Sequence, residues 1–362
     1  MRKPITIQPS IHTRISEVDF DNIPFGKVFS DHMYMADYND GEWHNPRIME
    51  FGPFMIHPAN LALHYGQSIF EGMKAYKQVD GTVCLIRPDE HSSRLNFSAE
   101  RMCMPTFPED MFMDALKELL TLDSEWIPTN EGSALYIRPF MFATGEVIGV
   151  QASTNYRMVI FSGPVGPYYN KPVRLLAEEH YSRAATGGVG EAKTSGNYAA
   201  SLLPAKLARE QGFDQVLWLD AKEFKYVQEV GTMNIFFVIG DKVVTPSTEG
   251  TILRGITRES IIELLLDRGY NVSEERISID EVVEAYKNGT LKEAFGSGTA
   301  ATIAHVSEIQ YKDLLMTLPP INERVIGTLC YDLLTGIRKG TIPDKFGWVI
   351  PINNEVAVLQ EQ

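Results

Sequence analysis

Short apolar runs in the first half of the chain predict β-strands. Runs of this kind occupy residues 28–35, 72–78, 83–87, 133–142 and 156–162. Two segments between them carry apolar residues at helical spacing instead, which predicts helices over residues 89–102 and 111–121. The first half therefore combines several strands with a few helices.

The second half alternates strands and helices after a break in the pattern. The break is the Gly- and Pro-rich stretch 163–172 (GPVGPYYNKP), which predicts a connection between two domains. Strands are expected at residues 173–179, 215–219, 234–238 and 293–295, and helices at residues 199–210, 258–268, 280–287 and 322–339. Such alternation is typical of a mixed α/β (α+β) fold. We expect a small N-terminal domain over residues 1–163, an interdomain linker over 164–175 and a large C-terminal domain over 176–362.

Charge and cysteine content exclude several classes of function. The 362 residues have a formal net charge of −14 and no Lys- or Arg-rich block, which argues against nucleic acid or an anionic membrane as the main partner. The N-terminal segment lacks the apolar stretch of a secretory signal, and no run approaches the length of a membrane span, so we expect a cytoplasmic protein. The three cysteines, Cys84, Cys103 and Cys330, lie far apart without a CxxC pair, so neither a disulfide framework nor a metal site is expected.

One lysine lies inside a glycine-rich loop that precedes a predicted helix. The loop, residues 187–196 (GGVGEAKTSG), comes close to the phosphate-binding pattern GxxxxGK[ST], but Ala192 stands at the final glycine position. A Cβ at that position obstructs a backbone cradle around phosphate. A nucleotide-binding module and a plain surface loop therefore stay open as alternatives to a reactive Lys193.

A second group of residues follows in the segments EVGTMNIF (229–236) and LRGITR (253–258). Together, Glu229, Asn234, Thr245, Gly255 and Arg258 resemble the signature of the class IV, fold-type IV pyridoxal-phosphate aminotransferases. The segments FSDHMYM, LHYGQSIFEGMKAY, ALYIRPF, GFDQVLWLD, EVGTMNIFFV and FGSGTA, in this order from residue 29 to 300, are similar to those of branched-chain-amino-acid aminotransferases. This resemblance implies a two-domain enzyme with pyridoxal 5'-phosphate held between its domains.

The resemblance also implies which residues bind the cofactor. Lys193 would link covalently to the cofactor aldehyde and shuttle the substrate proton, and Glu229 would face the pyridine nitrogen and keep it protonated. Tyr198 would hydrogen-bond the phenolate oxygen. The expected phosphate ligands are Arg94, Ile256, Thr257 and Thr299. Without the motif, Arg94 would be interpreted as a cation on the surface of a helix, and the segment GSGT (296–299) as a tight turn.

Substrate recognition is expected mainly in the first domain. Aromatic residues that match the family's pocket for an aliphatic side chain are Phe29, Tyr65, Phe70, Tyr136 and Tyr168. Taken alone, such residues belong to a core more often than to a pocket. Arg138 matches the arginine that receives the distal carboxylate of glutamate, and Thr232 belongs to the same expected site. The α-carboxylate would be bound near Thr299 and Ala300 and by the hydroxyl of Tyr65.

The implied reaction is a ping-pong transamination. L-Leucine, L-isoleucine or L-valine would give its amino group to 2-oxoglutarate, which yields branched-chain 2-oxo acids and L-glutamate in amino-acid biosynthesis. The resemblance also implies a homodimer or higher homo-oligomer. D-Amino acid aminotransferase and aminodeoxychorismate lyase are alternatives within fold-type IV. Ala301 and Ala304 replace the CxxC pair of the mammalian members, so a thiol switch is not expected there.

Overall fold

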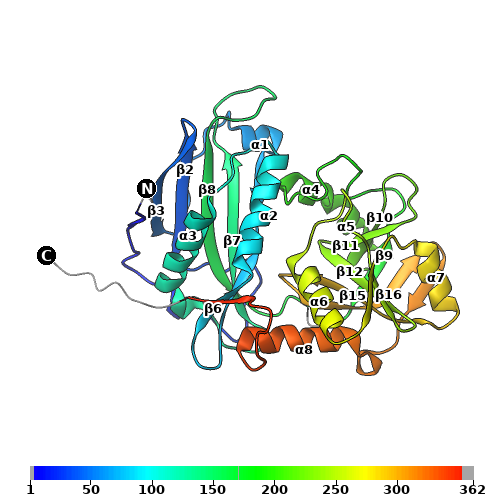
Figure 1. Cartoon of the computed structure of the whole chain (residues 1–362). Helices are drawn as coiled ribbons and strands as arrows, with labels where there is room; N and C mark the ends of the chain where they lie inside the picture. The colour runs from blue at the N-terminus through cyan, green and yellow to red at the C-terminus, as the bar shows by residue number, and fades with distance from the viewer. Residues whose placement is uncertain (1–3, 170, 353–362) are drawn as a thin grey trace. The chain divides into compact units, whose positions relative to one another are not determined.

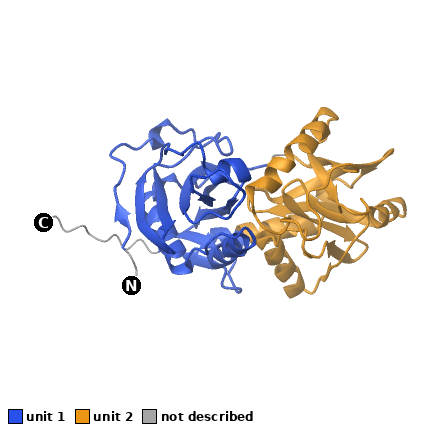
Figure 2. Ribbon diagram, turned by 90° about the horizontal axis from the view of Figure 1, so that it is seen from above, with its two compact units in different colours: residues 1–168, 336–362 blue, residues 169–335 orange. Residues whose placement is uncertain are grey.

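The computed structural model describes residues 4–169 and 171–352. The chain divides into two compact units, shown in separate colours in Figure 2. Unit 1 comprises Met1–Tyr168 together with Gly336–Gln362, and unit 2 comprises Tyr169–Thr335. Each unit is built around its own nine-stranded sheet.

The sheet of unit 1 is mostly antiparallel. Its strand order is β1-β3-β2-β8-β7-β5-β6-β18, with β4 paired to β7. The strands are β1 (Thr6–Ile7), β2 (His32–Asn39), β3 (Glu42–Glu50), β4 (Ser68–Phe70), β5 (Met73–Lys77), β6 (Val83–Ile86), β7 (Ala134–Ala143), β8 (Tyr156–Val165) and β18 (Val349–Pro351). Strands β7 and β8 pair along ten residues each, from Ala134 opposite Val165 to Ala143 opposite Tyr156.

Two amphipathic helices cover this sheet (Figure 1). Helix α2 (Pro88–Arg101) and helix α3 (Glu109–Leu122) bury one face each, and the apolar residues of α3 repeat at helical spacing as the sequence predicts. Their buried side chains share a core with Tyr34 and Ile48 of the sheet. The short helix α1 (Leu61–Tyr65) begins where the side chain of Asn60 accepts hydrogen bonds from two backbone N–H groups.

The strands of unit 2 close on themselves. Pairing runs through β11-β10-β9-β16-β15-β12, and β12 pairs with β11 again, so six strands form a ring. Strands β13 and β14 extend from β12, and β17 pairs with β16. The strands are β9 (Val173–Ala177), β10 (Gln215–Leu219), β11 (Val227–Val230), β12 (Met233–Ile239), β13 (Lys242–Thr245), β14 (Asn271–Glu274), β15 (Leu291–Gly298), β16 (Thr302–Tyr311) and β17 (Leu314–Thr317).

The helices of unit 2 flank this ring (Figure 1). They are α4 (Ser195–Ala200), α5 (Leu202–Glu210), α6 (Ile256–Asp267), α7 (Ile279–Lys287) and the first ten residues of α8 (Ile326–Lys339), whose residues from Gly336 onward belong to unit 1. Helix α7 starts with a capping box between Ser278 and Glu281. Helix α8 starts where the carboxylate of Glu293 accepts hydrogen bonds from three consecutive backbone N–H groups. Within the described residues, no helix is long and apolar enough to cross a membrane.

Several elements differ from the sequence expectation for identifiable reasons. The helix expected over residues 199–210 is interrupted at Ser201, which places Pro204 in the first turn of α5. A continuous helix would put that proline in its interior, where it lacks an N–H and clashes with the preceding turn. The strand expected over residues 28–35 begins only at His32, and the polar strand β3 was not predicted. Helix α8 starts at Ile326, after two prolines and a short 3₁₀ turn, instead of at residue 322.

The compact units differ from the expected domains at two places. Residues 336–362 group with unit 1, and strand β18 pairs with β6 there. Strand β8 continues to Val165 and β9 begins at Val173, so the expected linker 164–175 overlaps the ends of two strands. Pairing between distant segments causes both differences, and a local pattern does not report it.

Candidate active site

Lys193 ends a long loop that runs from β9 to α4 in unit 2. Its Nζ donates a hydrogen bond of 2.8 Å to the phenol oxygen of Tyr198, which lies one turn into α4. Asn197 holds the loop in place, because its side-chain amide donates to the carbonyl oxygens of Val189 and Ala192, at 2.9 Å each. Two residues that were predicted separately as cofactor ligands, Lys193 and Tyr198, therefore lie side by side in the structure.

Glu229 is a buried carboxylate on strand β11, with an exposed fraction of 3%. Its Oε1 accepts a hydrogen bond of 2.7 Å from the backbone N–H of Leu253 and lies 3.1 Å from Nη2 of Arg183. A buried carboxylate is costly unless it is paired with a cation and hydrogen-bonded, and Glu229 has both partners. These two contacts fix the orientation of the Glu229 carboxylate inside unit 2.

Arg183 was not predicted from the sequence. Its side chain has an exposed fraction of 8%, and its Nη2 also donates to the carbonyl oxygens of Gly190 (3.0 Å) and Thr251. Gly190 is required in this arrangement, because an added Cβ would overlap Ala184 and Thr251. Arg183 therefore ties the lysine loop to the strand of Glu229. An arginine ten positions before Lys193 has no local pattern that distinguishes it from a surface residue.

The N-terminus of α6 lies next to this framework. Ile256 and Thr257 occupy its first turn, and no side chain caps the helix at Gly255. Backbone N–H groups of a first helical turn have no acceptor inside the helix and favour an anion. Asn234 supports the turn, since its Nδ2 donates to the carbonyl oxygen of Leu253 at 2.9 Å and its Oδ1 fills the space that a Cβ of residue 255 would need. Two of the predicted phosphate ligands, Ile256 and Thr257, are therefore chemically suitable for a phosphate group.

Three of the expected site residues share a small hollow in unit 2. Tyr198, Glu229 and Thr232 line it together with Arg183 and Leu253. Thr232 is an exposed residue of the turn between β11 and β12. The half-buried residues Thr299 and Ala300 lie in the turn between β15 and β16.

In unit 1, Arg94 forms part of a buried charged cluster. Its Nε and Nη2 donate to the two carboxylate oxygens of Glu71 at 2.7 and 2.9 Å, and Nδ1 of His91 lies 2.8 Å from Glu71. Burial alone would raise the pKa of Glu71, but Arg94 and His91 lower it well below its usual range. This cluster fixes the orientation of Arg94, and its role as a phosphate ligand stays a prediction.

Arg138 is surrounded by aromatic rings in unit 1. Its guanidinium carbon lies 4.7 Å from the ring centre of Phe70 and 5.3 Å from that of Tyr136, and Nη2 donates to the Tyr136 hydroxyl at 3.0 Å. Residues 136 and 138 are two positions apart on β7, so their side chains point to the same face of the sheet. Gly72 allows this packing, because a Cβ there would overlap the Tyr136 hydroxyl.

The remaining aromatic residues fall into separate groups. Tyr168 joins Tyr136 through Phe25, whose ring centre lies 4.8 Å and 5.4 Å from theirs, respectively. Phe25 was missed in the sequence, because it lies outside the family segments. Phe29 packs instead against Phe51 and Phe161. Tyr65 has an exposed fraction of 39% and contacts the ring of His64.

Comparison with known proteins identifies the family. The family model for amino-transferase class IV matches residues 68–309. The chain belongs to the class IV aminotransferases. It is 47% identical, over 96% of both chains, to branched-chain-amino-acid aminotransferase 2 of Bacillus subtilis (strain 168).

Solved structures show the same fold as this chain. The branched-chain amino acid aminotransferase of Thermoproteus uzoniensis with norvaline is 26% identical, has a TM-score of 0.73, and covers 88% of this chain and 100% of its own. Two structures of a further branched-chain amino acid aminotransferase, from T.th., hold N-(5'-phosphopyridoxyl)-L-glutamate in one case and 4-methylvaleric acid in the other. Each of these two is 26% identical to this chain, has a TM-score of 0.70, and covers 88% of this chain and 98% of its own.

These similarities confirm the expected mixed α/β, fold-type IV architecture. Membership of this family also argues against the nucleotide-binding alternative.

We predict that Arg183 stabilises unit 2 through Glu229. Arg183→Met leaves a buried carboxylate without its cation and should lower the free energy of unfolding by about 3–5 kcal/mol. The double variant Arg183→Met/Glu229→Gln removes the unpaired charge and should recover most of that loss. Thermal unfolding of the two single variants and the double variant measures this coupling. If the effects of the two single variants simply add, the pair contributes nothing as a pair.

Proposed function

We propose that this class IV aminotransferase moves amino groups between L-leucine, L-isoleucine or L-valine and 2-oxoglutarate by a ping-pong mechanism. The observation that supports it best is the framework of unit 2, where a lysine amine paired with a phenol and a buried, cation-paired carboxylate belong to one site. The similarity to branched-chain enzymes over 96% of the chain supports the choice of substrates.

The residues present suit pyridoxal 5'-phosphate. When bound, this cofactor supplies an aldehyde for amino groups and a ring that accepts the electrons left when Cα loses its proton. Lys193 would hold the cofactor and move the proton, and Tyr198 would orient the lysine and donate to the ring oxygen. Glu229, fixed by Arg183 and by the Leu253 N–H, would face the ring nitrogen as an anion. The first turn of α6 would receive the phosphate through Ile256 and Thr257, with Thr299 and Arg94 as further ligands.

Arg138 and its aromatic neighbours suit a pocket for two kinds of side chain. The rings of Phe70 and Tyr136 offer an apolar surface to a branched aliphatic group, whereas the guanidinium can receive the distal carboxylate of glutamate. A relative has been solved in two structures, one with a glutamate adduct and the other with an aliphatic acid, which supports this dual use. The remaining expected members are Phe29, Tyr65, Tyr168, Thr232 and Ala300.

Cell location stays a prediction from the sequence pattern, and assembly stays a prediction from the family resemblance. A cytoplasmic homodimer acting in branched-chain amino acid biosynthesis is the state that we propose. Small amino acids and 2-oxo acids would be its partners.

The proposed reaction predicts which amino donors are accepted. With 2-oxoglutarate as acceptor, L-leucine, L-isoleucine and L-valine should each support turnover, while D-alanine should not. A steady-state panel that follows L-glutamate formation measures this. Incubation with aminodeoxychorismate should release no pyruvate, which excludes the lyase reaction. Turnover with D-alanine at a rate comparable to L-leucine would instead support a D-amino acid aminotransferase.

Arg138→Met should separate the two half-reactions. The variant loses the charge-assisted hydrogen bonds to the distal carboxylate, worth about 1.5–3 kcal/mol, so the glutamate half-reaction should weaken roughly ten- to a hundredfold relative to the leucine half-reaction. Single-turnover kinetics with each donor measure this ratio. Arg157→Met is a matched control, because Arg157 of β8 pairs with Asp37 in the same unit. Equal losses for both donors in Arg138→Met would show that Arg138 supports the fold or the α-carboxylate.

A further inference from the structure

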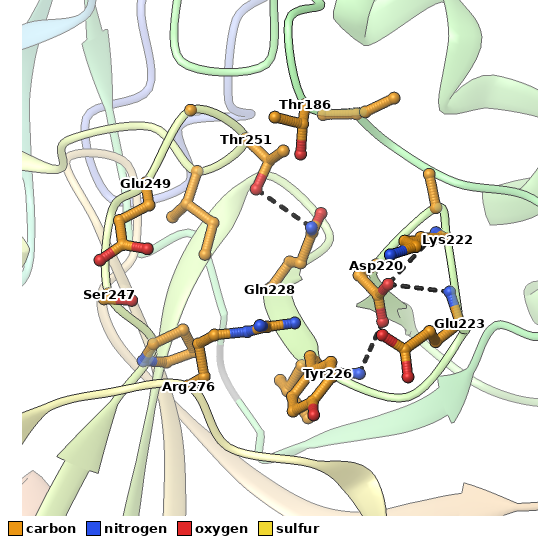
Figure 3. Close-up of a pocket in the computed structure, with 17 residues that line it drawn as sticks. Thr186, Asp220, Lys222, Glu223, Tyr226, Gln228, Ser247, Glu249, Thr251 and Arg276 are labelled. Atoms are coloured by element: carbon orange, nitrogen blue, oxygen red, sulfur yellow. Dashed lines mark hydrogen bonds between the residues drawn. The ribbon is translucent and has the colours of Figure 1, made fainter.

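Unit 2 contains a second cavity, distinct from the hollow beside Glu229. Its volume is about 780 Å³, which lies within the range of small-molecule sites. Successive residues of a strand point to opposite sides. On β11, Gln228 lines this cavity, whereas its neighbour Glu229 lines the hollow. Figure 3 shows Gln228 in the middle of the cavity wall, with Thr251 on one side and Arg276 on the other.

Gln228 carries a buried acceptor without a donor. The residue has an exposed fraction of 6%, and its Nε2 donates to the hydroxyl of Thr251 at 3.0 Å. Its Oε1 has no hydrogen-bond partner among the described residues. Leaving such an oxygen unpaired costs about 1–3 kcal/mol. A ligand that brings an N–H donor would satisfy it.

Arg276 provides a cation on the same wall. Its guanidinium carbon lies 3.7 Å from the ring centre of Tyr226, and this stacking fixes the group while its N–H donors lie in the guanidinium plane. Figure 3 shows that both side chains border the cavity. A planar carboxylate is the natural partner of a guanidinium held in this way.

The other charges of the cavity restrict the ligand further. Asp220 already accepts hydrogen bonds from the backbone N–H groups of its own turn, residues 222, 223, 225 and 226. The exposed carboxylates of Glu223 and Glu249 outnumber the exposed ammonium group of Lys222 on the rim, so the rim repels a multiply charged anion such as a phosphate ester. The same carboxylates attract an ammonium group. The cavity therefore favours a ligand that carries one positive and one negative charge.

We propose that the cavity binds a free apolar α-amino acid as its zwitterion. The carboxylate pairs with Arg276, and the ammonium group donates to Oε1 of Gln228. The aliphatic side chain packs against the apolar part of the lining, which includes Ala184, Pro246 and Ile252.

An occupied cavity would influence the Glu229 framework directly. Thr251 bonds Gln228 through its hydroxyl and accepts from Arg183 through its carbonyl oxygen, and Arg183 pairs with Glu229. A ligand that moves Gln228 or Thr251 therefore acts on the partner of the catalytic carboxylate. This effector role rests on the proposed function, whereas binding itself does not.

Equilibrium dialysis of borohydride-treated holoenzyme with labelled L-leucine tests the site. The treatment fixes the cofactor, so no amino group is transferred during the measurement. Wild-type protein should bind one more leucine per chain than Arg276→Met, or bind it at least tenfold more tightly at that site. Arg268→Met, which removes an exposed arginine outside the cavity lining, should behave like wild type. Ala185→Trp, which fills the cavity from its exposed rim without changing charge, should lose the same site.

Compounds with one charge each serve as competitors. Neither 4-methylvaleric acid, which lacks the ammonium group, nor isopentylamine, which lacks the carboxylate, should displace leucine from this site at tenfold excess. Equal binding by wild type and Arg276→Met would overturn the proposal, and so would displacement by either competitor. The number of leucine molecules bound per chain does not depend on turnover. The dialysis therefore tests the leucine site separately from the proposed transamination.

The effector role has its own readout. Initial rates plotted against L-leucine concentration should deviate from a single hyperbola in wild type and Arg268→Met, and should become hyperbolic in Arg276→Met. A single hyperbola in all three proteins would overturn the effector role.

Discussion

The proposed active-site framework depends on the burial of the Glu229 carboxylate with Arg183. A buried carboxylate is tolerated only with a cation and hydrogen-bond donors beside it. Arg183 supplies the cation and uses the same Nη2 to hold the carbonyl oxygens of Gly190 and Thr251. One arginine thereby links the loop of Lys193, the strand of Glu229 and the segment that leads to α6. The closed pairing of β11 with β10 and β12 keeps this strand in place.

The last residue of β4 and the two residues after it serve unit 1 in a comparable way. Phe70 packs on the guanidinium of Arg138, Glu71 turns inward to bind Arg94, and Gly72 leaves room for the Tyr136 hydroxyl. Three consecutive residues therefore shape the proposed substrate surface and orient the proposed phosphate ligand. The two requirements are independent, yet a shift of this segment would disturb both.

The sequence predicted elements with strong local patterns and residues inside family motifs. Helix α3 was predicted because its apolar residues repeat at helical spacing. Lys193 and Tyr198 were each proposed as cofactor ligands because they lie within one family motif, whereas the hydrogen bond between them was not predicted. Arg183 and Phe25 were missed because their roles arise from contacts that join distant segments. For the same reason the pairing of β18 with β6, which groups the C-terminal segment with unit 1, could not be read locally. The break at Ser201 was readable in principle, since Pro204 is incompatible with a helix interior.

The identity of the lysine that carries the cofactor tests this account most directly. The structure offers a competing amine in Lys74, because burial and the neighbouring Arg338 lower its pKa to about 7, which favours a neutral, nucleophilic form. Borohydride reduction of the holoenzyme, followed by proteolysis and mass spectrometry, shows which peptide retains the cofactor. The account predicts the modification on Lys193, with none in a Lys193→Ala variant. Modification of Lys74 or of any other lysine in the wild-type protein would contradict it.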